Sequence, residues 1–536
     1  MIQSRLEARA RGFLQPGCLE DQRLKREEAN VQLRKQKRFE HVAKRRAKLE
    51  MRGEAEDGEV DENWEIWEDW EDYMGEGLEE VLLQAEPNLC SNSLSAQQRL
   101  DLFLSLFASA SGNLLLPTLT ALKKLLGSSD SPPLNQVCRP DVLAKLVFLL
   151  EGEESAVLYE ALWCFTNLGT GSDQVICQIV AKGALPRLYR LIQHPEVRIS
   201  DSAIWVLSNM STADSVRKEI VAGKVVEMCV DIFHAEAQVR KHDYANMLHL
   251  IANLTLNYDY PPNSPFLAQV LSFVPWAFAQ ERESIIVRAC WICSYVADCK
   301  DESKLESILS LGVLPKLMEL MTAPSASIVV PALRTVGNLA SGNDSQTQAL
   351  LDLGLLSKLH LLLSHKERDV RRDAMWCISN VTAGTMEQTM SVIGHPVMAV
   401  ALEKMNDVDL EIRREATWAV VNAIGLLPFV TIKELGFTRV VDPLFYSLDY
   451  KDAIMLKIVL EGLMDLLTKE KAADETGVLE RFEELQGVVA LNSLMMHPNK
   501  PIWDLVSEIL RRFYDSEEVP RNSLEAAPPV PFYEFS

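Results

Sequence analysis

Two residue types return along this chain at a nearly constant interval, and this repetition constrains the fold more than any other feature. In "DAMWCISNVTAG" a tryptophan stands four residues before an asparagine, and "EATWAVVNAIG" repeats the arrangement 42 residues later. Successive asparagines are separated by 42, 44, 85, 42 and 42 residues, with Tyr295 at the middle of the double gap. Seven units in one register indicate an internal repeat. The polar positions are Asn167, Asn209, Asn253, Tyr295, Asn338, Asn380 and Asn422, and four residues before them stand Trp163, Trp205, His249, Trp291, Arg334, Trp376 and Trp418.

The segments between these positions have the pattern of amphipathic helices. In "ALPRLYRLI" and "LLSKLHLLL" the leucines are spaced three and four residues apart, and breakers such as "QHPE" and "SHKERD" separate neighbouring helices. A period near 42 residues with two or three helices per unit is typical of armadillo or HEAT repeats. We therefore expect an all-α fold, a right-handed superhelical armadillo-repeat solenoid of about 9–10 repeats, preceded by a basic helical segment.

The recurring Trp and Asn allow two interpretations. In the first they are core residues that share one helix face, although a repeated buried asparagine needs a polar partner. In the second, which we favour, the pairs line a concave groove, where the carboxamides bind the backbone of an extended peptide. Neighbouring indoles would then hold the stems of Lys or Arg, and the acids Glu160, Asp201, Asp373 and Glu415 would receive the cationic tips.

The net charge of −22 is unevenly distributed along the chain. Residues 1–52 carry 15 Lys/Arg and 7 Asp/Glu, whereas residues 53–82 carry 14 acids and no base. The remainder holds 39 bases and 55 acids, a balance of −16. An acidic body with a basic head favours cationic partners, the head of the same chain among them, and argues against direct nucleic-acid binding.

Several classes of protein are disfavoured by the sequence. No secretory signal or membrane-spanning apolar segment is expected, and the ten irregularly spaced cysteines favour a reducing compartment. Cys290 and Cys293 form a C-x-x-C inside a repeat helix, where we interpret them as packing residues. Without a phosphate-binding loop, a metal-spaced cluster or a nucleophile–base arrangement, we predict a protein that is not an enzyme and needs no cofactor or metal.

The basic head reads "LEDQRLKREEANVQLRKQKRFEHVAKRRAKLEMR" over residues 19–52, and it lacks proline and glycine. A helix is expected there, and a solvated charged tail or a nucleic-acid arm is the alternative. A cationic helix tethered to an acidic solenoid can dock on a partner or occupy the groove of its own chain, which predicts self-inhibition.

Together these features resemble the importin-α (karyopherin-α) family from about residue 5 to 515. "VQLRKQKRFEHVAKRR" is similar to the importin-β-binding segment of that family, and "YEALWCFTNLGTGSDQ", "SDSAIWVLSNMS", "PALRTVGNLASGNDSQTQ" and "DAMWCISNVTAG" are similar to its repeats. The resemblance implies a nuclear import adaptor that links cargo with mono- or bipartite basic nuclear localisation signals to importin-β. It also implies an export receptor of the CAS type as a partner, through "LRRFYD", and shuttling between cytoplasm and nucleus.

The resemblance also assigns the site residues. The major signal-binding site would contain Trp163, Asn167, Gly171, Trp205, Asn209, Asp214 and Asn253. The central and minor sites would contain Trp291, Tyr295, Arg334, Asn338, Trp376, Asn380, Glu415, Trp418 and Asn422. Importin-β binding or self-inhibition would use Arg23, Lys25, Arg26, Arg34, Lys35, Lys37, Arg38, Lys44, Arg45 and Arg46.

Departures from the family pattern fall mostly in the major site and the head. His249 replaces the third tryptophan of the major site, and Asp214 lies one residue later than the lysine-clamping acid of the family. We therefore predict that the minor site carries more of the affinity than is usual. In the head, "GFLQPGCLED" and "RLKREE" carry fewer basic residues than the family's stretches, which predicts weaker docking on importin-β.

The sequence divides into four parts. We expect an importin-β-binding-like basic segment at 1–52, an acidic linker with tryptophans at 53–97, an armadillo-repeat domain at 98–515 and a C-terminal tail at 516–536. The linker is interpreted as a spacer, with a clamp over the basic helix as the alternative. A cytoplasmic armadillo scaffold that binds extended basic peptides of other partners remains the alternative function.

Overall fold

The computed structural model describes residues 85–86, 94–128, 133–237, 241–256, 264–298 and 302–514. Every regular element in these ranges is a helix, which confirms the all-α prediction. The chain divides into two compact units, Met1–Val313 (unit 1) and Leu314–Ser536 (unit 2), which are described separately. None of the helices in these ranges is both long and apolar enough to cross a bilayer.

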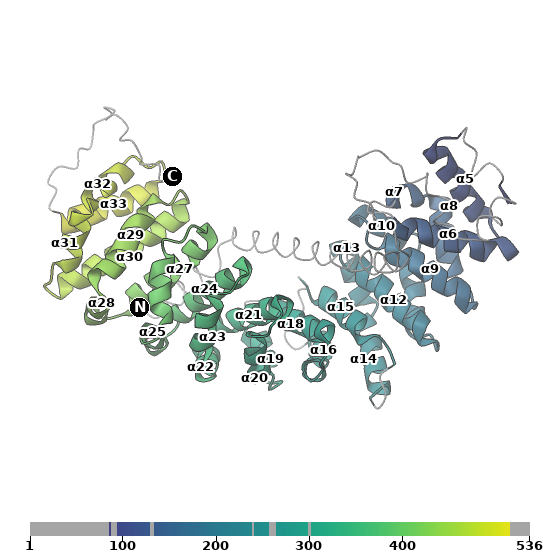
Figure 1. Cartoon of the computed structure of the whole chain (residues 1–536), viewed down its shortest axis with the longest axis horizontal. Coiled ribbons are helices and arrows are strands. Elements are labelled where there is room, and N and C mark those ends of the chain that lie inside the picture. Colours follow the sequence, from purple (N-terminus) through teal and green to yellow (C-terminus); the bar gives the residue numbers. More distant parts are fainter. Residues whose placement is uncertain are drawn as a thin grey trace, which may run out of the picture. The chain divides into compact units, whose positions relative to one another are not determined.

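Unit 1 is built from stacked repeats of a short helix, an amphipathic helix and a longer third helix (Figure 1). Its third helices α6, α9, α12, α15 and α18 pack side by side in that order. The elements of unit 1 are α5 (Ala96–Ser109), η2 (Gly112–Leu114), α6 (Leu115–Ser128), α7 (Leu134–Val137), α8 (Pro140–Leu149), α9 (Ser155–Leu168), α10 (Asp173–Ala181), α11 (Ala184–Ile192), α12 (Val197–Met210), α13 (Asp214–Ala222), α14 (Val225–Ala235), α15 (Tyr244–Thr255), α16 (Pro265–Leu271), α17 (Val274–Phe278), α18 (Glu283–Ala297) and α19 (Glu302–Leu309).

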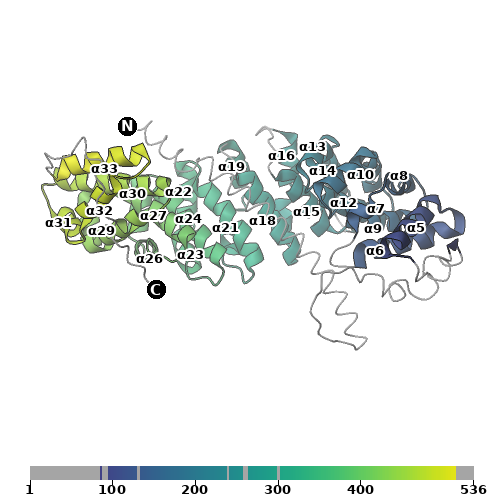
Figure 2. The same cartoon turned by 90° about the horizontal axis from the view of Figure 1, so that it is seen from above.

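Unit 2 repeats this plan, and its third helices α21, α24, α27, α30 and α33 also pack in chain order (Figure 2). The elements of unit 2 are α20 (Leu314–Leu320), α21 (Ala326–Ala340), α22 (Asp344–Asp352), α23 (Leu355–Leu362), α24 (Arg368–Thr382), α25 (Met386–Ile393), α26 (Val397–Lys404), α27 (Leu410–Leu426), α28 (Phe429–Leu435), α29 (Phe437–Tyr446), η3 (Ser447–Asp449), α30 (Ala453–Ala472), α31 (Gly477–Glu484), α32 (Gly487–Leu494) and α33 (Lys500–Phe513).

Local sequence explains where the helices of a repeat begin. Gly183 and Gly354 adopt left-handed φ values of 81° and 78° at the starts of α11 and α23, a conformation that glycine reaches without a steric cost. Asn343 and Thr385 form capping boxes with the residue three positions later, so the first turns of α22 and α25 are satisfied by their own side chains. The turns between helices are therefore encoded within a few residues.

Cations from neighbouring helices satisfy the ends of three of the third helices. Arg217 of α13 donates to the carbonyl oxygens of Ser211 (3.0 Å) and Leu256 (3.0 Å), which follow α12 and α15. In unit 2, Lys469 of α30 donates to the carbonyl oxygens of Gly425 and Leu427 at the end of α27 (3.0 and 2.7 Å). These bonds satisfy carbonyls that have no partner within their own helix, and they join neighbouring repeats.

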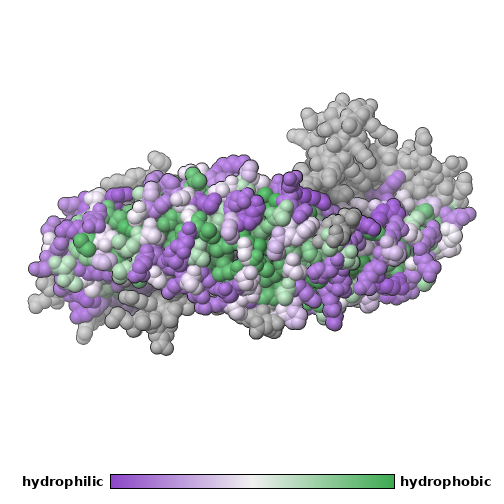
Figure 3. Space-filling view, turned by 90° about the horizontal axis from the view of Figure 1, so that it is seen from below, coloured by the Kyte–Doolittle hydropathy of each residue, from purple (hydrophilic) through white to green (hydrophobic). Residues whose placement is uncertain are grey.

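The described surface mixes polar and apolar side chains. In the view of Figure 3, hydrophilic and hydrophobic residues are interspersed over the described surface. Large exposed apolar residues such as Phe148 of α8, Leu361 of α23 and Val489 of α32 come from separate repeats. Single exposed apolar residues of this kind are normal on protein surfaces.

Candidate functional site

The recurring positions lie on the third helices of the repeats. Within unit 1 they fall on α9, α12, α15 and α18, and within unit 2 on α21, α24 and α27. We call these the ladder helices, and the side that carries the Trp and Asn positions is the ladder surface of each unit. Trp163, Trp205, Trp376 and Trp418 are partly exposed on it.

The asparagines form a regular chain of hydrogen bonds between neighbouring ladder helices. Five of the six ladder asparagines donate from Nδ2 to a carbonyl oxygen one repeat earlier, 43 to 45 residues back in the chain. The pairs are Asn167 to Lys123 (3.5 Å), Asn209 to Thr166 (2.9 Å), Asn253 to Ser208 (2.9 Å), Asn380 to Gly337 (2.9 Å) and Asn422 to Ser379 (3.1 Å). The polar partner that a buried asparagine requires is thus the backbone of the previous repeat.

This bond uses only part of each carboxamide. A carboxamide has two N–H donors and an oxygen with two acceptor sites, so one donor joins the repeats while the remainder can serve a ligand. Asn380 (1% exposed) and Asn253 (6% exposed) are buried, whereas Asn167, Asn209 and Asn422 are half-buried. The half-buried asparagines are therefore the better placed for an incoming peptide.

The tryptophans of the two units are arranged differently. In unit 1 the rings of Trp163 and Trp205 touch edge to face, with centroids 5.1 Å apart and planes at 69°. Trp291 is buried and stacks on Tyr295 of its own helix, with centroids 5.3 Å apart. In unit 2 the ring of Trp376 lies over Gly337, where a Cβ would come within 2.2 Å of its Cζ3.

His249 does not form a wall on the ladder surface of unit 1. Its side chain is buried, and its Nδ1 lies 3.0 Å from the Oγ of Ser208 on the preceding ladder helix. The hydrogen bond directs the imidazole toward α12, so little of its surface is exposed.

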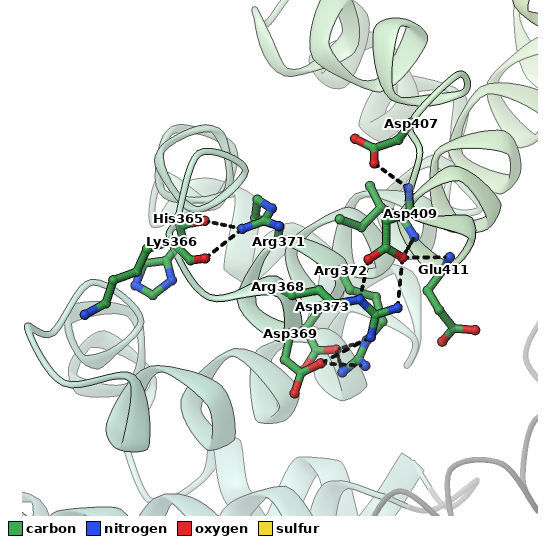
Figure 4. A network of polar contacts seen from close by, with 11 residues as sticks. His365, Lys366, Arg368, Asp369, Arg371, Arg372, Asp373, Asp407, Asp409 and Glu411 are labelled. Carbon is green, nitrogen blue, oxygen red and sulfur yellow. Dashed lines mark hydrogen bonds and ion pairs between the residues drawn. The ribbon is translucent and has the colours of Figure 1, made fainter. Parts of the chain in front are cut away.

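Arg334 occupies a tryptophan position in unit 2 and takes part in an ion-pair network. Its Nε donates to Oδ2 of Asp373 (3.0 Å), and Arg372 donates to the other oxygen of the same carboxylate (2.7 Å). Asp373 is buried; desolvation by itself raises its pKa, but the two guanidinium groups outweigh this and hold the pKa below its usual range. Figure 4 shows Arg372 between Asp369 and Asp373, with Arg368 reaching Asp409 of the next repeat.

The acids that precede the tryptophans have partners within the protein. Glu160 forms an ion pair with Lys123 (2.7 Å), and both carboxylate oxygens of Asp201 accept from the backbone N–H of Asp243 (3.1 Å each). Glu415 accepts from the Oγ of Ser379 (3.4 Å), and burial raises its pKa to about 7. These acids therefore stabilise the stack through contacts within the protein.

Two further residues of the expected major site follow the ladder helices α9 and α12 in the chain. Gly171 follows α9, and a Cβ there would come within 3.0 Å of Val175 and of the Leu168 carbonyl. Asp214 begins α13, where its exposed carboxylate pairs with Arg217 (2.7 Å). The carboxylate of Asp214 is thus already paired with a cation of the same helix.

The residue before each asparagine is a structural position that the sequence reasoning missed. Ser208 holds His249, Gly337 lies under Trp376, and the carbonyls of both accept from the next asparagine. The signal was present, because small residues stand immediately before six of the seven ladder positions: Thr166, Ser208, Ala252, Ser294, Gly337 and Ser379.

Some predicted parts lie outside the described residues. These are the basic segment 1–52 with all of its Arg and Lys positions, nearly all of the linker 53–97 and the tail 516–536. Among the described residues, no group of three or more His, Cys, Asp or Glu side chains is arranged to hold a metal ion.

Comparison with known families finds two matches. The importin beta binding domain matches residues 16–98, and the armadillo/beta-catenin-like repeat matches residues 172–212 and 303–341. The chain is 20% identical to a solved engineered protein, with a TM-score of 0.66 over 77% of this chain and 98% of that one, which supports the armadillo-type fold.

Relatives are found in plants and in an amoeba. The chain is 29% identical over 251 residues to importin subunit alpha-1a of Oryza sativa subsp. japonica, covering 44% of each chain. It is 25% identical over 343 residues to importin subunit alpha-3 of Arabidopsis thaliana (61% of this chain, 56% of that one). It is 27% identical over 367 residues to importin subunit alpha-B of Dictyostelium discoideum (64% and 60%). The matches therefore span between 44% and 60% of the length of these relatives.

Proposed function

Since this chain belongs to the importin-α family, we propose that it acts as a nuclear import adaptor, joining cargo that carries basic localisation signals to importin-β. Residues 1–52 are the proposed importin-β-binding segment, and the ladder surfaces of the two units are the proposed cargo sites. The role is binding and not catalysis. An export receptor of the CAS type and shuttling between cytoplasm and nucleus complete the proposal.

The observation that carries the proposal is the regular hydrogen-bond chain between ladder helices. Because Asn209 and Asn422 each donate to the previous repeat, successive ladder helices are held in one register. That register places partly exposed indoles at equivalent positions of consecutive repeats. An extended peptide has a regular backbone and side chains at even steps, so a regular array of indoles and carboxamides is suited to bind it.

Charge supports a basic ligand. The chain outside residues 1–82 has a balance of −16, from 39 bases and 55 acids. Long-range attraction raises the association rate of a cationic peptide with such a body, and residues 1–52, at +8, are a cationic segment of the same chain. Self-inhibition by this segment is part of the proposal, because tethering gives it a high effective concentration.

The test uses the full chain, immobilised importin-β and a fluorescent bipartite basic peptide. Replacement of Lys44, Arg45 and Arg46 by Ala is expected to weaken importin-β binding and to strengthen peptide binding. A charge-matched control replaces the exposed Lys182, Lys218 and Lys366, and is expected to change neither. Peptide binding without importin-β binding would support the scaffold alternative, and the absence of both would overturn the proposal.

A further inference from the structure

We propose that the ladder surface of unit 1 selects arginine over lysine in the basic segment that it binds, and that His249 sets this preference. The inference rests on the proposed function, because it names the ligand chemistry of the same surface. Three features of unit 1 lead to it: the distance between the indoles, the position of the imidazole and the partners of the nearby acids.

The indoles of unit 1 leave no slot for a lysine stem. A methylene chain held between two apolar walls makes carbon–carbon contacts of 3.5–4.0 Å on each side, so the walls must be about 7–8 Å apart. The centroids of Trp163 and Trp205 are only 5.1 Å apart, and their planes meet at 69°. The two rings fill the space between them, and a stem cannot enter without separating them.

The next slot lacks one of its walls. The imidazole of His249 is hydrogen-bonded to Ser208 and is 9% exposed, so it presents little surface to a ligand beside Trp205. A lysine at this position would contact one ring only. Lysine gains most of its apolar contact from a stem enclosed on two sides, whereas a planar guanidinium stacks on a single aromatic face.

The acids of unit 1 already have partners within the protein, as Asp373 does in unit 2. The carboxylate of Glu160 is paired with Lys123, and both oxygens of Asp201 accept from the backbone of Asp243. Lysine depends on a point-charge contact for much of its binding energy, whereas arginine adds stacking to its charge. A site whose carboxylates already have partners therefore penalises lysine more.

Unit 1 already holds one guanidinium in this way. The Cζ of Arg198 on α12 lies 4.1 Å above the ring centroid of Tyr159 on α9, and Tyr159 is in edge-to-face contact with Trp163. This arginine is largely exposed, so single-face stacking on the aromatic cluster does not need a closed slot.

Unit 2 provides an internal contrast. Among its described residues, ring contacts join His360 to His395, Phe429 to Phe437 and Phe445 to Tyr446 and Phe482, and none joins Trp376 to Trp418. Trp376 and Trp418 lie on the consecutive ladder helices α24 and α27. The arginine preference is accordingly a property of unit 1.

The experiment compares two peptides that differ only in having four lysines or four arginines between glycine flanks. Their binding to the full chain is measured by fluorescence anisotropy in a Trp376→Ala, Trp418→Ala background, which removes the contribution of unit 2. We expect the arginine peptide to bind on the order of 5- to 10-fold more tightly, the scale of one stacking contact. The basic head competes with both peptides alike, so the ratio of the two affinities is unaffected.

His249→Trp is the deciding variant. Position 418 of unit 2 is equivalent to position 249 and carries a tryptophan. The equivalence follows from the asparagines four residues later, because Asn422 donates to the carbonyl of Ser379 as Asn253 donates to the carbonyl of Ser208. The added indole is expected to strengthen lysine binding and bring the ratio near one. His234→Trp, at an exposed position of α14 away from the ladder surface, is the matched control and should leave the ratio unchanged.

The outcomes separate the inference from the proposed function. If the starting chain binds neither peptide, the proposed function fails. If it binds both equally, or lysine more tightly, the function stands and the inference is overturned. If His249→Trp does not fold, as judged by circular dichroism, Trp205→Ala decides instead: loss of the arginine preference supports the inference, and its retention overturns it.

Discussion

Asn380 donates a side-chain N–H to the carbonyl oxygen of Gly337, 2.9 Å away and 43 residues earlier in the chain. The same bond recurs in both units with Asn167, Asn209, Asn253 and Asn422. The bond gives two buried polar groups, the carbonyl and the carboxamide, a hydrogen-bond partner. It also holds neighbouring ladder helices in register, and with them the tryptophans that stand one turn before the asparagines.

Asn380→Ala is expected to destabilise unit 2 by about 1–3 kcal/mol, because it leaves a buried carbonyl without its donor. Asn167→Ala should cost less, since the corresponding bond to Lys123 is longer at 3.5 Å and the residue is half-buried. Urea unfolding followed by circular dichroism measures both, with the exposed Asn406→Ala as the control. Equal losses for all three would show that the bond has no stabilising role.

Gly337→Ala is expected to displace the indole of Trp376, because the new Cβ would lie 2.2 Å from Cζ3. We expect a loss of about 1–3 kcal/mol in stability from overpacking and weaker peptide binding to unit 2. Gly394→Ala is the control, since its Cβ would meet nothing closer than 3.6 Å. The two changes Gly337→Ala and Trp376→Ala should be non-additive; strict additivity of their effects on unfolding would argue against the contact.

Trp376→Ala with Trp418→Ala is expected to weaken binding of a lysine-rich bipartite peptide more than Trp163→Ala with Trp205→Ala. The reason is that unit 1 lacks a wall at His249 and its two indoles contact each other. A difference of roughly tenfold in Kd corresponds to one or two cation–π contacts. Isothermal titration calorimetry on the full chain tests this, and a larger loss from the unit 1 pair would contradict it.

Glu415 is expected to make the stability of unit 2 depend on pH. Burial raises its pKa from an ordinary value of 4.5 to about 7, so between these values the folded chain binds more protons than the unfolded chain. The free energy of unfolding therefore falls as pH rises through this window. At high pH the Glu415→Gln protein should be more stable than the parent chain by on the order of 1–3 kcal/mol, because it has no buried carboxylate to ionise. Unfolding midpoints at pH 5.5, 7 and 8.5 measure it.

The control for this prediction is Glu403→Gln, at an exposed position of α26. The advantage of Glu415→Gln over the parent chain should grow from pH 5.5 to pH 8.5, while the control should follow the parent chain. Parallel profiles for all three proteins would show that Glu415 does not titrate in this window.

The amino-acid sequence by itself determined the all-α fold, the repeat register and the helices that carry the Trp and Asn positions. These properties depend on local patterns: the spacing of leucines, capping residues such as Thr385 and left-handed glycines such as Gly183 all act within a few residues.

Only the tertiary structure decided what those side chains contact. The partners of Asn209, His249 and Glu415 lie 36 to 43 residues away in sequence, and they meet only when repeats stack. The edge-to-face contact of Trp163 with Trp205 and the burial of Asn380 likewise form only when repeats stack. Such contacts depend on inter-repeat packing and desolvation, which are collective properties of the stack, so a single repeat unit read from the sequence does not specify them.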